Sequence, residues 1–119
     1  MAVVTADEVK RKLPDSYSSW TDAEINDYIT DAERVASILL GQDISSSTDY
    51  DIKELVAIVS AMRILIKDGA SRADKVSPYY LLRDELKTLL PKLEFKYSEE
   101  LSGSLPDEDD FIFTLEDEW

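Results

Sequence analysis

The sequence predicts an all-α protein, a bundle of about four helices with an extended acidic C-terminal arm. Three observations lead to this prediction. Apolar residues recur in several segments with the 3.6-residue period of a helix, these segments begin and end at residues that typically cap helices, and strand signals are few. The length of 119 residues is that of one domain, which can bury a core without disulfides.

The first helix is expected over residues 6–13. Thr5 and Glu8 have the spacing of a capping box, in which the hydroxyl accepts from a first-turn amide and the carboxylate accepts from the amide of the cap. Pro14 disfavours a continuation of this helix.

A second helix is expected between Thr21 and Gly41. Thr21 and Glu24 repeat the capping-box spacing, and Gly41 is suited to the C-terminal cap. Asp27 and Asp31 lie outside an arc of apolar residues that follows the helical period. That arc consists of Ile25, Tyr28, Ile29, Ala32, Val35, Ala36, Leu39 and Leu40.

A third helix is expected from a cap at Asp49 or Asp51 to about Asp68, with Gly69 ending it. Its polar residues occupy only a narrow strip, so nearly every side of the helix must be covered. Either it is the central helix of the bundle or another subunit buries part of its surface. In the second case the candidate subunit interface is formed by Arg63, Ile64 and Lys67.

A fourth helix is expected to open at Ser77-Pro78, because these residues suit the N-cap and the first helical position. Leu82, Leu86, Leu89 and Leu93 lie on one side of it. Pro91 removes a backbone donor and crowds the preceding turn, which predicts an end or a kink near Leu90.

The charge divides the chain into two parts. The 119 residues carry 26 acids and 13 bases, a net charge of -13. Residues 97–119 hold nine acids and no base, which leaves 17 acids and 13 bases in residues 1–96, so the two parts carry -9 and -4. We therefore expect a helical domain over residues 1–96 and an acidic, aromatic-containing arm over residues 97–119.

The composition excludes many kinds of chemistry. There is no His and no Cys, which removes Ser-His-Asp and Cys-His catalysis, thiolate sites and typical zinc sites. The three glycines are too scattered for a phosphate-binding loop, and the net charge repels nucleic acid. No apolar run is long enough for a membrane span, and no signal peptide is expected. We expect no catalytic residue, no metal site and no cofactor.

The arm is the candidate partner-binding segment, because apolar side chains stand within a solvated acidic stretch. They are Phe111, Ile112, Phe113, Leu115 and Trp119. One hypothesis is that residues 111–115 add as a strand to the sheet edge of a partner, with Trp119 as an anchor. The other is that these side chains fold back and close the core of the bundle.

The order of elements resembles that of the small, all-helical head–tail connector proteins of tailed viruses. The likeness covers residues 5–93 and rests on a short opening helix (5–13), an acidic amphipathic helix (21–35) and a very apolar helix (52–65). The resemblance implies a structural assembly protein of the virion neck, made in the host cytoplasm, and no enzyme. It implies a homo-oligomeric ring of about a dozen copies beneath the portal protein. Such a ring extends the DNA channel, lets DNA pass without sequence-specific binding, and docks a neck or tail-completion protein.

A different class of function is also compatible with the sequence. The chain would then be a monomeric acidic regulator or inhibitor that mimics nucleic acid and binds a basic partner through its arm.

Overall fold

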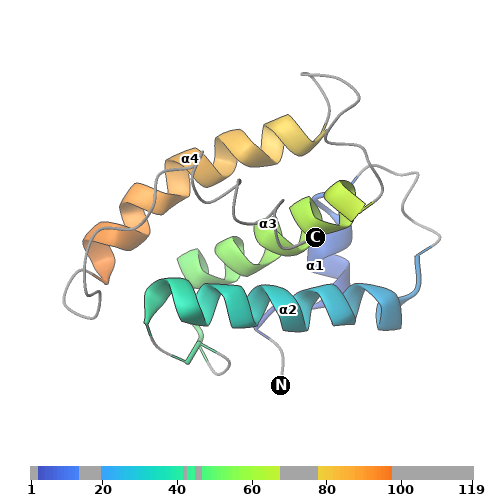
Figure 1. Cartoon of the computed structure of the whole chain (residues 1–119), viewed down its shortest axis with the longest axis horizontal. Helices are drawn as coiled ribbons and strands as arrows, with labels where there is room; N and C mark the ends of the chain where they lie inside the picture. The colour runs from blue at the N-terminus through green and yellow to red at the C-terminus, as the bar shows by residue number, and fades with distance from the viewer. Residues whose placement is uncertain (1–2, 14–19, 42, 45–46, 68–77, 98–119) are drawn as a thin grey trace.

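The computed structural model describes residues 3–13, 20–41, 43–44, 47–67 and 78–97. Within these ranges it contains four helices and no strand, so the predicted all-α fold is confirmed. The helices are α1 (Ala6–Lys10), α2 (Asp22–Leu40), α3 (Tyr50–Lys67) and α4 (Pro78–Lys96). In Figure 1, α3 lies between α2 and α4, and α1 packs against both α2 and α3. Residues 98–119, which make up nearly all of the predicted arm, lie outside the described residues.

Both predicted capping boxes are present. In α1 the Thr5 hydroxyl accepts from the Glu8 amide, and in α2 the Thr21 hydroxyl accepts from the Glu24 amide. α1 is shorter than the predicted 6–13. It ends at Lys10, and the amides of Lys12 and Leu13 bond three residues back, in tighter turns that continue to Leu13.

The other end of α2 is closed by Gly41. Its φ of 68° lies in the left-handed region that residues with a Cβ avoid, and its amide donates to the Ile38 carbonyl. A glycine is therefore needed at this position, as the sequence predicts.

α3 is the central helix of the described bundle. Of the two alternatives for its apolar surface, coverage within the chain is the one observed, because α3 contacts α1, α2 and α4. Every residue from Leu55 to Leu65 is buried. Of its two candidate caps, Asp49 is the one used, since its carboxylate accepts from the Asp51 amide at 2.9 Å.

α4 passes through Pro91 and continues to Lys96, so a helix end near Leu90 is wrong, while the alternative of a kink there stays a prediction. The ring of Pro91 is on the exposed side, while Leu89, Leu90 and Leu93 are buried on the other side. Burial of a leucine side chain contributes roughly 1.5–3 kcal/mol. A proline within a helix opposes it by about 3 kcal/mol, so the packing of these leucines outweighs the proline.

One continuous core joins the four helices, and salt bridges add to it at the surface. The core includes Val3, Val9, Ile29, Ile58 and Leu86, one or more residues from each helix and from the segment before α1. Lys12, which follows α1, pairs with Glu54 of α3 at 3.0 Å and with Glu85 of α4 at 3.4 Å. None of the described helices is long and apolar enough to cross a membrane.

Candidate functional site

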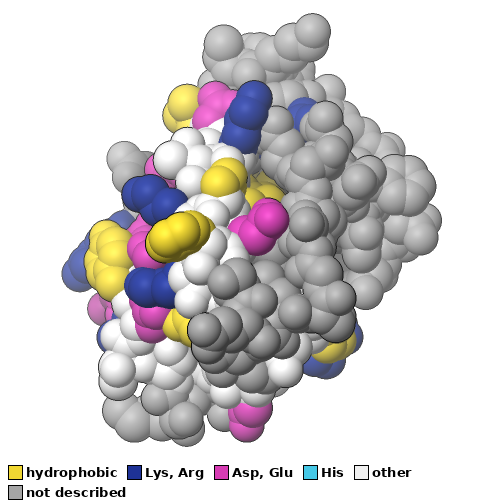
Figure 2. Space-filling view, turned by 90° about the vertical axis from the view of Figure 1, so that its left-hand side faces the viewer, with side chains coloured by type: hydrophobic (Ala, Val, Ile, Leu, Met, Phe, Trp, Pro, Cys, Tyr) yellow, Lys and Arg dark blue, Asp and Glu magenta, His cyan; other side chains and the backbone are white. Residues whose placement is uncertain are grey.

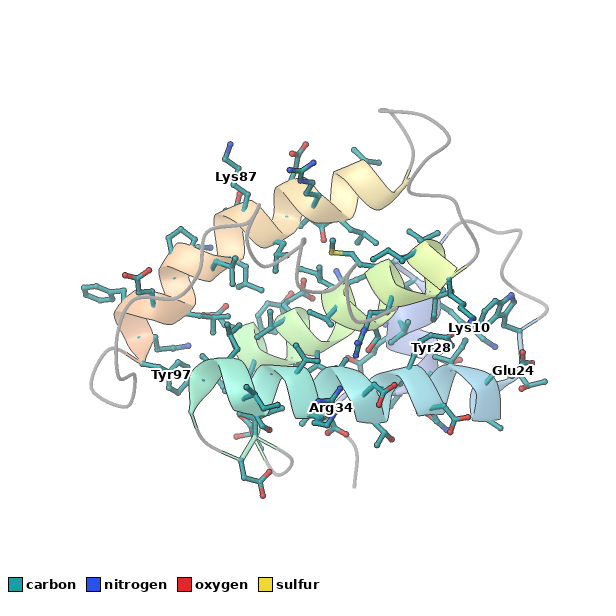
Figure 3. The ribbon with its side chains drawn as sticks, viewed as in Figure 1. Lys10, Glu24, Tyr28, Arg34, Lys87 and Tyr97 are labelled. Carbon is teal, nitrogen blue, oxygen red and sulfur yellow. The ribbon has the colours of Figure 1, made fainter. Side chains whose placement is uncertain are left out.

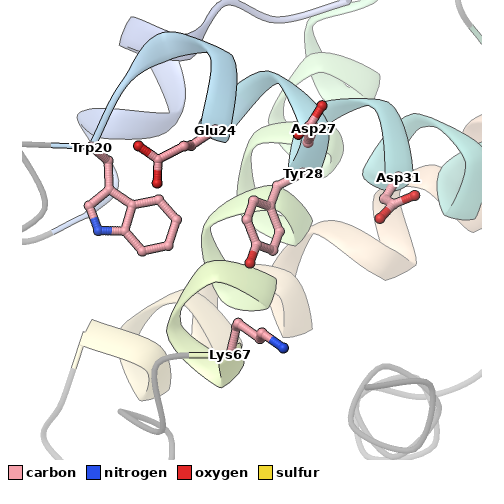
Figure 4. Close-up of a pocket in the computed structure, with 6 residues that line it drawn as sticks. All are labelled: Trp20, Glu24, Asp27, Tyr28, Asp31 and Lys67. Atoms are coloured by element: carbon pink, nitrogen blue, oxygen red, sulfur yellow. The ribbon is translucent and has the colours of Figure 1, made fainter.

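A hollow that combines charged and aromatic side chains lies where α2 begins and α3 ends. Its volume is about 560 Å³. The described residues that line it are Trp20, Glu24, Asp27, Tyr28, Asp31 and Lys67. Figure 4 shows Trp20 and Tyr28 on the same side of α2, with Glu24 between them and Asp31 farther along the helix.

Helical spacing brings the side chains of α2 together. Glu24, Tyr28 and Asp31 follow one another at steps of four and three residues, and Asp27 adjoins them, so all four lie along one face. The capping box holds the first turn, because one Glu24 carboxylate oxygen accepts from the Thr21 amide at 3.1 Å and from its hydroxyl at 2.9 Å. The capping box therefore fixes the part of the lining that comes from the first turn of α2.

Two aromatic rings form the wall of the hollow. The centroids of the Trp20 and Tyr28 rings are 6.1 Å apart and their planes are inclined by 50°, a geometry typical of attractive aromatic pairs. Both rings are half-buried and pack against the core. The Tyr28 hydroxyl points toward Lys67 at the end of α3 (Figure 4).

The field in the hollow is negative. Burial raises the pKa of the Tyr28 hydroxyl, and the nearby carboxylates of Asp31 and Glu24 raise it further. Arg63 acts on the same hydroxyl in the opposite direction. The described lining contains three carboxylates and one ammonium group, so a net negative charge remains.

The arrangement of the carboxylates suits a cationic group larger than a single ion. Within the described ranges no group of three or more acidic side chains is close enough to hold a metal ion. The carboxylates are instead distributed along two turns of α2, beside the aromatic wall. This combination of π faces and negative charge is typical of sites that bind organic cations.

The predicted interface residues of α3 have different surroundings. Arg63 and Ile64 are buried within the single chain, with exposed fractions of 1% and 0%. Lys67 is exposed and lines the hollow. Burial in the chain's own core accounts for the first two residues without a neighbouring subunit, and the predicted subunit contact stays a prediction. The five predicted partner-binding residues of the arm (Phe111, Ile112, Phe113, Leu115 and Trp119) lie outside the described residues.

The opposite end of the molecule holds the root of the arm. The Lys96 ammonium donates to Asp49 at 2.9 Å and to Asp51 at 3.1 Å, and the Tyr97 hydroxyl donates to the second Asp49 oxygen. In Figure 3, Tyr97 lies at the far end from Tyr28 and Glu24. The last residues of α4 are therefore attached to the first turn of α3.

These contacts change the ionisation of both partners. Burial raises the pKa of the Tyr97 hydroxyl to about 12, and its hydrogen bond to Asp49 adds to this effect. Burial alone would raise the pKa of the Asp49 carboxyl, but the hydrogen bonds from Tyr97 and Lys96 outweigh it and the pKa is lowered.

Large apolar side chains are also exposed near this end. They include Ile38, Tyr50 and Phe95, whose exposed fractions are 69%, 73% and 87%. Figure 2 looks at this end of the molecule and shows hydrophobic side chains scattered among basic and acidic ones. They form no single apolar patch in this view, so we assign them no site.

Sequence reasoning missed the hollow. The signal was present as the acid and aromatic residues at positions 24, 27, 28 and 31, which share a helix face. Their function could not be inferred, because Trp20 and Lys67 reach the same place only through the packing of α2 on α3.

Comparison with protein-family models, with curated proteins and with solved structures finds no match. Function must therefore be inferred from the chain's own sequence and geometry.

Proposed function

We propose that this protein is a structural component of a virion, a head–tail connector that forms a ring beneath the portal protein. The ring extends the DNA channel and provides the docking surface for a neck or tail-completion protein. The protein performs no catalysis in this role, and DNA contacts it only in passing.

The observation that carries the proposal is the order and character of the helices. A short capped helix is followed by an acidic amphipathic helix and then by an apolar helix, which is the pattern that resembles the connector family. The surface charge is consistent with the role, because a negative channel lining repels the phosphate backbone and prevents DNA from adhering.

Assembly with the portal protein tests the proposal. The full chain is mixed with the portal protein encoded near its own gene, and the mass of the product is measured by native mass spectrometry and its shape by electron microscopy. We expect a ring with many copies bound to the portal. A chain that remains monomeric at all portal concentrations would contradict the proposal.

The arm offers a second measurement in the same assay. If residues 97–119 dock on the partner through their nine acids, binding weakens steeply as the salt concentration rises. A flat salt response would mean that Phe111, Phe113 and Trp119 dominate the contact. Deletion of the arm separates its contribution from that of the helices.

The alternative function is that of a monomeric acidic regulator that occupies the basic groove of a nucleic-acid-binding protein. The charge of -9 in the arm favours this alternative. It predicts a persistent monomer that competes with DNA or RNA for a basic protein, which a competition assay with labelled nucleic acid detects. The neighbouring genes also discriminate, since portal, capsid and tail genes accompany a connector.

A further inference from the structure

We propose that the hollow lined by Trp20, Glu24, Asp27, Tyr28, Asp31 and Lys67 binds an arginine side chain in a basic segment of a partner protein. The proposal goes beyond the connector function and does not depend on it, because neither ring assembly nor the portal enters the argument.

Two carboxylates of the hollow lack the ion pairs that several other acidic groups of the described bundle form. Lys12 pairs with both Glu54 and Glu85, and Lys96 pairs with both Asp49 and Asp51. In the described part of the chain, Asp27 and Asp31 form no ion pair. Their negative charge is therefore available to a ligand.

The aromatic wall determines which cation fits. A guanidinium is planar, stacks on aromatic faces and can give two parallel hydrogen bonds to a carboxylate, whereas an ammonium is a compact and strongly hydrated charge. Trp20 and Tyr28 present adjoining rings 6.1 Å apart, with Glu24 between them and Asp31 beyond (Figure 4). A guanidinium lying across the rings can reach these carboxylates.

The size and the remaining charges also favour a side chain carried by a protein. A hollow of about 560 Å³ is larger than one ion requires, and its described carboxylates are too dispersed to ligate a metal ion. Lys67 occupies one side, which leaves the end toward Glu24 and Asp27 for the incoming cation. The raised pKa of Tyr28 agrees with a negative field at the wall.

Calorimetric titration of the full chain with a hexa-arginine peptide with blocked ends tests the proposal. The variant is the double substitution Asp27→Asn/Asp31→Asn, and the matched control is Asp7→Asn/Asp84→Asn, which removes two exposed charges outside the hollow. We expect the first pair to weaken binding about tenfold and the second less than about twofold at low salt. Equal weakening by both pairs would mean that binding reports only the overall charge and would overturn the proposal.

A second comparison tests the aromatic wall. The unmodified chain should bind hexa-arginine at least about threefold more tightly than hexa-lysine, and Tyr28→Leu should abolish this preference. Equal affinity for the two peptides, or a preference that persists in Tyr28→Leu, would exclude the site.

If a variant does not fold, NMR of the unmodified chain still tests the proposal. The chain has two tryptophans, Trp20 and Trp119, whose indole N–H signals are separable by NMR and assigned with Trp119→Phe. Addition of hexa-arginine should move the Trp20 signal. An unchanged Trp20 signal at saturation would overturn the proposal.

Discussion

Thr21 shows how a single residue sets the start of a helix that carries the candidate site. Its hydroxyl accepts from the Glu24 amide at 3.2 Å while Glu24 reaches back to the Thr21 amide at 3.1 Å. These two bonds satisfy amides that the helix itself cannot pair. They also fix the position of Glu24 in the lining of the hollow.

Replacement of Thr21 by Ala should lower the free energy of unfolding by about 1 kcal/mol, because an amide of the first turn loses its acceptor. Thr30→Ala is the matched control, since Thr30 is exposed in the middle of α2 and its hydroxyl only donates to the Asn26 carbonyl. The control should change stability by less than about 0.5 kcal/mol. Urea unfolding followed by circular dichroism measures both, and an equal effect of the two substitutions would contradict the role of the cap.

Asp49 combines two functions that a substitution can separate. Its carboxylate caps α3 and also accepts from Lys96 and Tyr97 at the root of the arm. Asn is an equally good cap, so Asp49→Asn removes mainly the charge.

The pH dependence of stability should reveal that charge. The pKa of Asp49 is lower in the folded chain than its ordinary value of 3.8, so its stabilisation is present above 3.8 and is lost as the pH falls through the lowered value. Asp49→Asn should therefore be less stable than the unmodified chain near neutral pH, and the two should converge in strong acid. Chemical unfolding at about pH 6 and about pH 3 measures the difference. A difference that is constant with pH would disprove the assignment.

At the scale of elements, α4 shows that packing can override a local signal. The helix continues through Pro91 because leucines on both sides of it are buried against the rest of the bundle. The missing amide leaves a defect on the exposed side of the helix.

Pro91→Ala should raise the free energy of unfolding by about 1 kcal/mol or more, because it restores an amide donor without changing the core. The gain is smaller than the full penalty of a helical proline, since the proline also restricts the unfolded chain. Lys92→Ala, at the next exposed position, should be nearly neutral. Destabilisation by Pro91→Ala would show that this turn depends on the proline ring.

The central position of α3 has an equally direct test. Ile64 is fully buried and Ile38 of α2 is 69% exposed, so the same change to Ala can be made in both surroundings. Ile64→Ala should lower the free energy of unfolding by about 2–5 kcal/mol, and Ile38→Ala by less than about 0.5 kcal/mol. Similar small effects at both positions would mean that α3 is not enclosed.

At the scale of the whole molecule, the charge and the core occupy different parts of the chain. The described core extends from Val3 to Leu93, whereas residues 97–119 hold nine acids and no base. The described core is therefore built from residues 3–93, and the arm contributes most of the net charge.

A chain without residues 98–119 should still fold, because the core of α1 to α4 is retained. Its circular dichroism spectrum should show the helix content expected for α1 to α4. The net charge falls from -13 to -4, which reduces repulsion within the chain. Circular dichroism and thermal unfolding of the truncated chain measure this. Loss of cooperative unfolding would show instead that the arm completes the core.

The residues that the sequence predicts correctly are those whose interactions are local. Thr5, Thr21 and Gly41 act within four residues of their partners, and their conformations follow from the local sequence. The contact of Asp49 with Tyr97 joins residues 48 apart, and nothing in the local pattern of either one indicates it. The burial of Arg63 is equally invisible, because a helical pattern places this residue on the polar strip of α3.

The all-α class, the starts of α1 and α2 and the end of α2 could be predicted from the sequence, since they follow from local hydrogen bonds and from the spacing of apolar residues. The packing of the helices was needed to establish that α3 is central, that α4 continues through Pro91 with its last residues attached to α3, and that Trp20, Tyr28 and Lys67 line one hollow. The physical reason is that these features depend on contacts between distant segments, whose energies exceed local preferences once the helices pack.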